Sequence, residues 1–409
     1  MNKRKKNSKG KVVFFTYKNY RNNPMLKMYT SAFKTRYDCL VSCFDSKTTP
    51  PEKDIQLTNI SINHWEYIRA LYRKSPIELK NLLKKINFIK KISLYLLTLL
   101  FIVNFIINNF IFLAKQFRFV KSGVRLVFAV DGDYLLASWL TARLLGAKFY
   151  YFVYEIWPDQ YPVTSLVDRA EKSARTALEY FFCNRADKVI TVQDVVSKYI
   201  RRKYHLNNNV MATIPVCPDK YSATTFSVET PLKLHYHGAY QASRGLDELI
   251  LAFKQVSSAT LYLRGVGDYE KILRDLVIKE NLTERIFFLD AVPSDQLVSN
   301  SVSFDVGVIL ASPNTGNGRM CVGFKLYEYI NSGLAVLAPS SLPLMNVLRK
   351  SGCGVTYGWP NSNKIAAQIE LMKSDISAVM EMKKAAIKLS RTYNSEYQID
   401  RLLKLTDLS

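Results

Sequence analysis

Short apolar runs typical of buried strands alternate with helical segments along most of this chain. In the first half the runs are KVVFFTY (11–17), DCLVSCF (38–44), RLVFAVD (125–131), KFYYFVYE (148–155) and KVITV (188–192). In the second half they are LKLHYHG (232–238), ATLYLRG (259–265), RIFFLD (285–290), DVGVIL (305–310) and LAVLAP (334–339). Helical stretches such as 194–206 and 269–281 lie between them. This alternation predicts an α/β fold with mostly parallel sheets.

The length of the chain indicates that this fold contains two domains. A chain of 409 residues is too long for one ordinary hydrophobic core, so we predict two open, doubly wound domains, residues 1–220 and 221–390. The Ser- and Thr-rich stretch 219–231 is the predicted linker. Residues 391–409 are predicted to form a C-terminal helix, for which packing back on the N-terminal domain is one arrangement. Ligands of such sheets bind outside the carboxyl ends of the strands, which predicts a ligand site in a cleft between the domains.

Cysteine spacing and the N-terminus indicate the compartment. The six cysteines form no CxxC pair and no metal-ligand spacing. The N-terminal MNKRKKNSKGK has no apolar signal core after its charges. We therefore expect free thiols in a reducing cytoplasm.

The positive charge is concentrated in the first third of the chain. Residues 1–130 contain 25 Lys and Arg against 6 Asp and Glu, a net charge of +19, whereas the rest contain 32 against 28, a net charge of +4. A basic surface of this size attracts nucleic acid or an anionic membrane, and charge alone does not choose between them.

An uncharged apolar run, residues 93–114, lies inside this basic third. Its 22 residues are long enough to cross a bilayer. Strand-like segments lie on both sides of it, however, and basic residues flank both ends without an inside-outside bias. We favour a helix that covers the sheet and lies in the membrane interface, with Leu99, Phe101 and Ile102 toward lipid. The alternatives are a wholly buried helix and a true span.

The segment GFKLYEYINSGLAVLAPS (323–340) combines two charges with an apolar helix and a buried strand. Lys325 and Glu328 are three residues apart and so share one face of the predicted helix. They lie in its first turn, beside free backbone N–H groups and the positive end of the helix dipole, a place that suits a phosphorylated ligand. The alternative is a surface ion pair, which would contribute little.

The ordered set of segments resembles the family 4 glycosyltransferases of the GT-B fold, of the bacterial envelope or capsular polysaccharide type. The resemblance is carried by HGAYQASRGLDELILAF (237–253), the segment from Arg264 to Val292 with its Gly-x-Gly turn, and GFKLYEYINSGLAVLA (323–338). YEIWPD (154–159) and 186–204 match in the first half. The resemblance implies two Rossmann-like domains facing a central cleft, and an enzyme that transfers a hexosyl or related sugar.

The resemblance also implies roles for particular residues. Lys325 and Arg244 would act in catalysis by meeting the departing phosphate, and Glu328 would accept hydrogen bonds from the ribose hydroxyls. Gly238 would let the backbone approach the phosphate closely. The remaining donor- or substrate-binding positions that it implies are Gly267, with Gly265 beside it, Phe324 and Glu155.

Two departures from the family pattern bear on the sugar and the mechanism. Many members have a second glutamate eight residues before the ribose-binding one, where this chain has Met320. Contacts to the donor sugar would then come from the loop SPNTGNGRM, through Asn314, Thr315 and Gly316 or through backbone amides. A histidine that many members have is replaced by Tyr154. Family members retain anomeric configuration by a proposed front-side mechanism that needs no protein nucleophile, because the leaving phosphate takes the acceptor proton.

Two other patterns contain residue types that bind metal ions. Asp131-Gly132-Asp133 has the Asp-x-Asp form with which GT-A glycosyltransferases hold a metal. His235 and His237 alternate on a strand and share a face, and the sequence offers no third ligand. We interpret the first as a loop that faces the cleft and the histidines as packed or cleft-lining. No metal and no cofactor are expected.

The residues and the resemblance together predict a glycosyltransferase that transfers a sugar from a nucleotide sugar to a lipid-linked glycan acceptor. It would be cytoplasmic and peripheral at the inner face of the cell membrane, with an anionic lipid surface as a partner. The alternatives are a GT-B-like sugar-nucleotide epimerase and a basic nucleic-acid-binding protein. Against the latter, the sequence has no recognisable RNA- or DNA-binding motif, so no nucleic-acid partner is expected.

Overall fold

The chain folds into two compact units, Met1–Ile214 and Pro215–Ser409. A computed structural model describes residues 10–16, 23–43, 55–59, 87–116, 120, 123–220, 227–228, 230–311, 319–320, 322–358 and 361–406. The two units divide six residues before the predicted boundary at 220/221, and part of the predicted linker lies outside the described residues. The arrangement of the units about a cleft stays a prediction, as does the packing of the C-terminal helix on the N-terminal domain.

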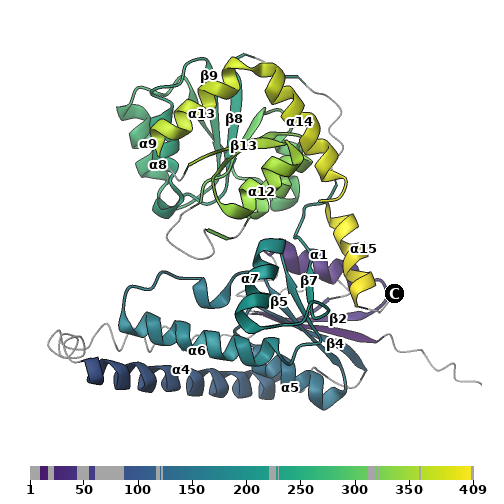
Figure 1. Cartoon of the computed structure of the whole chain (residues 1–409). Helices are drawn as coiled ribbons and strands as arrows, with labels where there is room; N and C mark the ends of the chain where they lie inside the picture. The colour runs from purple at the N-terminus through teal and green to yellow at the C-terminus, as the bar shows by residue number, and fades with distance from the viewer. Residues whose placement is uncertain are drawn as a thin grey trace, which may run out of the picture. The chain divides into compact units, whose positions relative to one another are not determined.

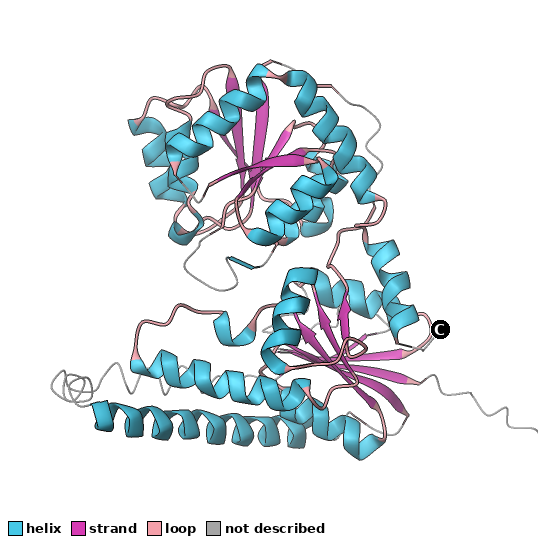
Figure 2. Cartoon of the chain, in the orientation of Figure 1, coloured by secondary structure: helices cyan, strands magenta, loops and turns pink. Residues whose placement is uncertain are grey.

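The N-terminal unit contains a seven-stranded parallel sheet (Figures 1 and 2). The strand order is β3-β2-β1-β4-β5-β6-β7. The strands are β1 (Lys11–Thr16), β2 (Asp38–Cys43), β3 (Ile55–Asn59), β4 (Val124–Val130), β5 (Lys148–Val153), β6 (Lys188–Thr191) and β7 (Met211–Thr213). The helices are α1 (Pro24–Phe33), α4 (Asn87–Gln116), α5 (Leu135–Leu145), α6 (Leu166–Cys183) and α7 (Asp194–Tyr204), with a 3₁₀ turn η1 (Trp157–Asp159).

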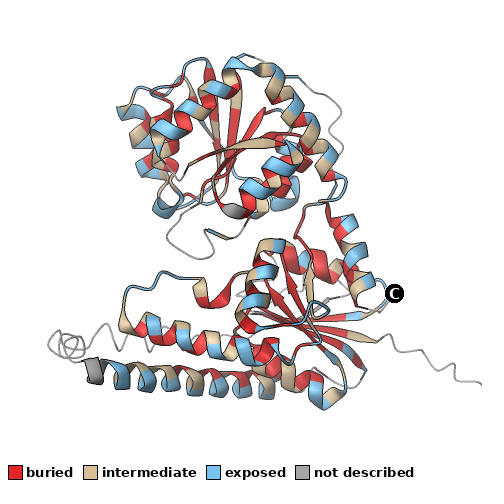
Figure 3. Ribbon diagram, viewed as in Figure 1, coloured by how far each residue is buried: buried red, intermediate tan, exposed pale blue. Residues whose placement is uncertain are grey.

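Both faces of this sheet are covered, which explains why its central strands are continuously apolar. Phe14 of β1 contacts Phe33 of α1, whereas the next residue, Phe15, contacts Phe112 of α4. Successive side chains of a strand point to opposite faces, so α1 and α4 lie on opposite sides of the sheet. A strand covered on both sides has no polar face, and β1 and β4 are accordingly almost wholly buried (Figure 3).

The C-terminal unit contains a six-stranded parallel sheet of order β10-β9-β8-β11-β12-β13. The strands are β8 (Leu232–His237), β9 (Ala259–Arg264), β10 (Ile286–Leu289), β11 (Val306–Val308), β12 (Ala335–Pro339) and β13 (Gly354–Tyr357). The helices are α8 (Leu246–Ala252), α9 (Glu270–Lys279), α11 (Phe324–Asn331), α12 (Leu342–Ser351), α13 (Ser362–Ser374), α14 (Ile376–Ser390) and α15 (Ser395–Leu405), with 3₁₀ turns η2 (Ala242–Arg244), η3 (Ser294–Gln296) and η4 (Ser299–Ser301).

This second sheet is doubly wound as well. Ala335 and Leu337 of β12 belong to one apolar cluster with α8, α9 and α13. Val336 and Ala338 of the same strand belong to another with α11, α12 and α14. The predicted α/β fold with two doubly wound parallel sheets is therefore confirmed, and every strand predicted from an apolar run is present. The structure adds three short strands, β3, β7 and β13, at the sheet edges.

Helix α4 contains the uncharged run and lies between β3 and β4 in chain order. By length and composition, its segment Lys91–Gln116 could cross a membrane. The strands β1 and β4 on its two sides pair with each other in one sheet, however. Both ends of α4 therefore lie in the same unit, which argues against a crossing.

One face of α4 packs on the N-terminal unit. Phe101 lies in an apolar cluster with Val167, Ala170 and Ala174 of α6. The buried Asn109 accepts a hydrogen bond from the backbone of Ala137 at 2.9 Å, so α4 is also fixed to α5. The expectation that Phe101 and Ile102 face lipid is wrong, because Phe101 is fully buried and Ile102 packs against the same cluster. Leu99 is exposed, as expected.

Candidate functional site

The C-terminal sheet changes its winding direction between β8 and β11. From β8 the chain proceeds outward through β9 and β10, returns to β11 on the other side of β8, and continues through β12 and β13. Open α/β sheets bind ligands at such a switch point, outside the carboxyl ends of the strands. β8 ends there with His237, which Gly238 follows, and α11 comes after the end of β11 in the chain. The fold thus brings the predicted residues of both segments to one edge of the sheet.

Lys325, in the first turn of α11, lies against the end of β8. Its Nζ is 3.4 Å from the hydroxyl oxygen of Tyr236 and 4.6 Å from the centroid of the Tyr236 ring. A Cβ on Gly238 would lie 2.7 Å from Nζ and Cε of Lys325, and Gly238 has a φ of 138°. The backbone conformation therefore requires glycine here, and a larger residue would also push the end of the Lys325 side chain aside. The sequence predicted that the backbone at Gly238 approaches a phosphate closely. In this structure the group that lies close to Gly238 is the side chain of Lys325.

The surroundings of Lys325 favour an anion. Burial, then the positive charge of Arg244, lower the pKa of the Lys325 ammonium to about 8, while Glu328 acts in the opposite direction. Desolvation and a nearby like charge both disfavour the charged form. A bound phosphate would relieve both effects, because it is an anion that accepts hydrogen bonds from the ammonium.

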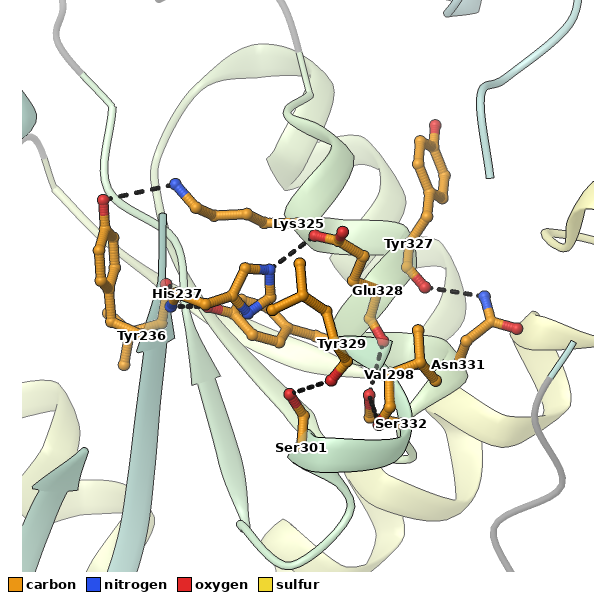
Figure 4. A network of polar contacts seen from close by, with 12 residues as sticks. Tyr236, His237, Val298, Ser301, Lys325, Tyr327, Glu328, Tyr329, Asn331 and Ser332 are labelled. Carbon is orange, nitrogen blue, oxygen red and sulfur yellow. Dashed lines mark hydrogen bonds and ion pairs between the residues drawn. The ribbon is translucent and has the colours of Figure 1, made fainter. Parts of the chain in front are cut away.

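Glu328 is held by β8 rather than by Lys325. Its Oε2 lies 2.6 Å from Nε2 of His237, and both residues are buried (Figure 4). Next to them, the hydroxyl of Tyr329 accepts a hydrogen bond from the backbone N–H of His237 and donates one to the carbonyl of Val308, each at 3.2 Å. These contacts fix α11 against β8 and β11. The alternative of a surface ion pair between Lys325 and Glu328 does not describe this arrangement, since Glu328 is buried and paired with a histidine.

The contact between His237 and Glu328 was missed by the sequence analysis, which treated His237 as packed or cleft-lining. The available signal was its position as the last residue of a strand that ends beside the predicted helix. His235, two residues earlier, has a packing role: its ring stacks on Phe304 at 4.3 Å, and Nδ1 lies 3.2 Å from the carbonyl of Tyr262. Burial, then the charge of His237, lower the pKa of His235 to about 3.

Arg244 and the predicted glycines lie in the loops around the same edge. Arg244 ends the 3₁₀ turn η2, is exposed, and is close enough to Lys325 to lower its pKa. A Cβ on Gly265 would lie 2.0 Å from the carbonyl oxygen of Gly238, and one on Gly267 would lie 2.2 Å from that of Tyr240. These two glycines therefore allow the loop after β9 to pack on the loop after β8. Phe324 begins α11 and is half-buried.

Most of the predicted sugar-binding loop lies outside the described residues. Asn314, Thr315 and Gly316 lie outside the described residues. Met320, which stands where many family members have a glutamate, lies just after this gap and is half-buried. The contacts proposed for the donor sugar stay a prediction.

Glu155 and the Asp-x-Asp pattern belong to the N-terminal unit. The Oδ1 atom of Asp131 accepts hydrogen bonds from the backbone N–H groups of Tyr154 and Glu155, both at 3.1 Å. A Cβ on Gly132 would lie 1.8 Å from the indole of Trp157. Asp131 and Gly132 therefore hold the loop after β5 and its tryptophan in place. Within the described part of the chain, no group of three or more His, Cys, Asp or Glu side chains could hold a metal ion.

Residues 219–389 match the family Glycosyl transferases group 1, and no match was found among curated proteins. Sucrose-phosphate synthase of Thermosynechococcus elongatus has a similar structure, with a TM-score of 0.68 at 13% identity over 98% of each chain. HepE of Anabaena, crystallised with UDP, has a TM-score of 0.67 at 12% identity over 98% of this chain and 100% of that one. TarM of S. aureus has a TM-score of 0.66 at 12% identity over 97% and 100%.

At these identities the structural matches show the fold, which is that of the GT-B glycosyltransferases. The family match covers Gly238, Arg244, Lys325 and Glu328. Together the two findings support a glycosyltransferase of the GT-B type. They do not favour an epimerase or a nucleic-acid-binding protein.

Proposed function

We propose that this protein is a retaining glycosyltransferase of family 4 that transfers a hexosyl or related sugar from a nucleotide sugar to a lipid-linked glycan. The observation that carries the proposal is the joint placement of Lys325, Glu328 and Arg244 at the carboxyl edge of the C-terminal sheet. The proposed pathway is the synthesis of a cell-envelope or capsular polysaccharide.

Each residue of this set has a role that follows from its chemistry. A carboxylate accepts hydrogen bonds from the two neighbouring ribose hydroxyls, and the contact with His237 orients Glu328 for this role. The Lys325 ammonium meets a phosphate oxygen, and Arg244 adds a second positive charge. Negative charge develops on the diphosphate as the sugar bond breaks, and cations placed in advance stabilise that charge in the transition state.

The proposed reaction uses no protein nucleophile and no metal. The leaving phosphate accepts the proton of the acceptor hydroxyl as the new glycosidic bond forms on the same face of the sugar. Such a reaction needs no side chain that acts as a general base. It is therefore compatible with Tyr154, which stands where many family members have a histidine. Glu155 beside it is proposed to contact the substrate.

Similar structures suggest which donor and pathway to test first. HepE has been crystallised with UDP and with UDP-glucose. WaaG, which has a TM-score of 0.58 at 13% identity over 97% of this chain and 99% of that one, is described as involved in lipopolysaccharide biosynthesis. We therefore take UDP as the first nucleotide and a membrane-held glycan as the acceptor. The proposed location is the cytoplasmic face of the cell membrane.

Calorimetric titration with UDP, GDP and ADP tests the donor site. Lys325→Ala removes a charge-assisted contact of roughly 1.5 to 3 kcal/mol, and affinity should fall about ten- to a hundredfold. Glu328→Gln keeps the shape of the side chain and should also weaken binding. Lys350→Ala, which removes an exposed lysine of α12, is the matched control and should bind as the wild type does. Unchanged binding in both site variants would overturn the assignment.

Product analysis separates transfer from epimerisation. A transferase consumes the nucleotide sugar only with an acceptor or water, and NMR of the anomeric proton of the product reports retention. An epimerase would convert the sugar nucleotide to its isomer with no acceptor present. Accumulation of such an isomer would replace the proposed function.

A further inference from the structure

The face of α4 that points away from the protein carries a row of large apolar side chains. Six of them are more than half exposed and define what we name the α4 stripe: Tyr95, Leu96, Leu99, Leu100, Ile107 and Phe110. Within the part of the chain that the structure describes, nothing covers this face (Figure 3). Large contiguous apolar surfaces of this kind mark interaction sites.

The stripe extends along most of the helix and ends between lysines. The exposed apolar side chains run from Ile92 to Ile111, which is about 29 Å along the helix axis. Lys91 and Lys115 lie at its two ends, and both are exposed. An apolar helix face with cations at its margins fits the boundary between lipid headgroups and acyl chains.

A basic groove lies beside α4 on the outer surface of α6. This α6 groove has a volume of about 670 Å³ and is lined by Leu94 of α4, by Arg169, Lys172, Thr176 and Tyr180 of α6, and by Lys203 of α7. None of the described residues that line it is acidic. Lys172 also pairs with Asp159, yet 44% of its side chain stays exposed. Three cations, together with the hydroxyl groups of Thr176 and Tyr180, provide the donors that a phosphate needs.

We infer that the α4 stripe and the α6 groove form one docking surface for an anionic phospholipid bilayer. The stripe lies among the first methylenes of the acyl chains, while Arg169, Lys172 and Lys203 bind lipid phosphates. Leu94 of α4 lines the groove and directly precedes Tyr95 of the stripe in the chain, so the groove begins beside the N-terminal end of the stripe. This inference rests on the proposed function in one respect: a lipid-linked acceptor would be presented at the same surface.

The charges favour a membrane over a second copy of the chain as the occupant. A two-fold dimer through the α4 stripe buries the same surface of both copies. It would bring the cationic margins of two strongly basic chains, each of net charge +23, toward each other. An anionic bilayer instead complements these charges, and each cation near it strengthens binding.

Vesicle co-sedimentation of the full-length protein tests the two parts separately. One set of vesicles contains phosphatidylcholine alone, and the other adds phosphatidylglycerol. Leu96→Gln, Leu99→Gln and Ile107→Gln together should lower binding to both sets, by about tenfold for each side chain removed from lipid. Arg169→Gln with Lys203→Gln should weaken binding only to the anionic set, by about fivefold for each cation.

Matched control variants remove side chains of the same kinds from the C-terminal unit. Ile272→Gln, Ile278→Gln and Leu371→Gln remove three exposed apolar side chains from the C-terminal unit. Arg349→Gln with Lys350→Gln removes two exposed cations from α12. Neither control should change vesicle binding. All substitutions are at exposed or half-buried positions, and the melting temperature of each variant shows whether it folds.

The outcomes distinguish this inference from the proposed function. Wild-type protein that binds UDP but neither set of vesicles overturns the docking surface alone. Equal losses in the site and control variants overturn it too, as does a dimer in sedimentation velocity that the stripe variant dissociates. Wild-type protein that binds vesicles but no nucleotide leaves the docking surface in place and overturns the proposed function.

Discussion

Nε2 of His237 lies 2.6 Å from Oε2 of Glu328, although the two residues are 91 positions apart in the chain. Both are buried, with 3% and 4% of their surface exposed. The same histidine is fixed through its backbone N–H, which donates to the hydroxyl of Tyr329. The end of β8 therefore holds the carboxylate of α11 in one orientation. We interpret His237 as a positioning residue for Glu328, which is the proposed ribose ligand.

Replacement of His237 should weaken nucleotide binding without removing any contact to the nucleotide itself. His237→Ala leaves the carboxylate without its donor, and affinity should fall by about tenfold. His237→Gln supplies an amide N–H and should recover part of the loss, which a purely space-filling role would not produce. Calorimetry with UDP measures both. His235→Gln, a change two residues earlier on the same strand face, should alter stability but not affinity, and an equal loss of affinity there would contradict the interpretation.

Nucleotide affinity should depend on pH through Lys325. Its pKa is lowered to about 8 by burial and by Arg244, so the ammonium is mostly charged at pH 7 and mostly neutral at pH 9. A phosphate binds the charged form, and affinity should therefore fall as pH rises through 8, by up to about tenfold per pH unit. Lys325→Arg keeps its charge at these pH values and should give a flat profile. A flat profile for the wild type would show that Lys325 does not meet the phosphate.

A buried ion pair should stabilise the C-terminal unit. Lys383 of α14 lies 3.2 Å from Asp305 and donates to the carbonyl of Phe304 at 3.0 Å. Lys383→Met leaves the carboxylate buried without its cation, and the free energy of unfolding in urea should fall by about 3 to 5 kcal/mol. The next residue provides the control: Lys384 pairs with Glu381 on the surface, so Lys384→Met should cost less than about 1 kcal/mol. Equal effects of the two changes would show that burial of the pair is unimportant.

Chelation of metal ions should leave turnover of the donor largely intact. The first aspartate of Asp131-Gly132-Asp133 already accepts two backbone N–H groups, and the proposed reaction needs no Lewis acid. Asp131→Asn combined with Asp133→Asn should keep nucleotide binding, because asparagine still offers the accepting oxygen. Donor hydrolysis measured with EDTA present is the assay. Activity that disappears with EDTA and returns with manganese would support the metal-binding alternative instead.

The α/β class and the central strands followed from the amino-acid sequence because their signal is local. A strand buried on both faces is apolar at every position, so β1, β4, β5 and β12 are recognisable without knowledge of their neighbours. The placement of two charged residues on one face of α11 is also determined by the local sequence. Lys325 and Glu328 share a helix face whatever surrounds them, and the family resemblance added the chemistry that they serve.

Tertiary structure decided the features that depend on partners far away in the chain. The short edge strands β3, β7 and β13 carry polar residues and pair only because a neighbouring strand is present. The exposed face of α4 could not be predicted, since a helix that is apolar on nearly all sides shows no polar face to orient it; Phe101 became buried because α6 packs there. His237 and Glu328 meet only because parallel strands align their carboxyl ends at one edge of the sheet. Contacts of this kind arise from the order of the strands, and no local pattern of residues encodes that order.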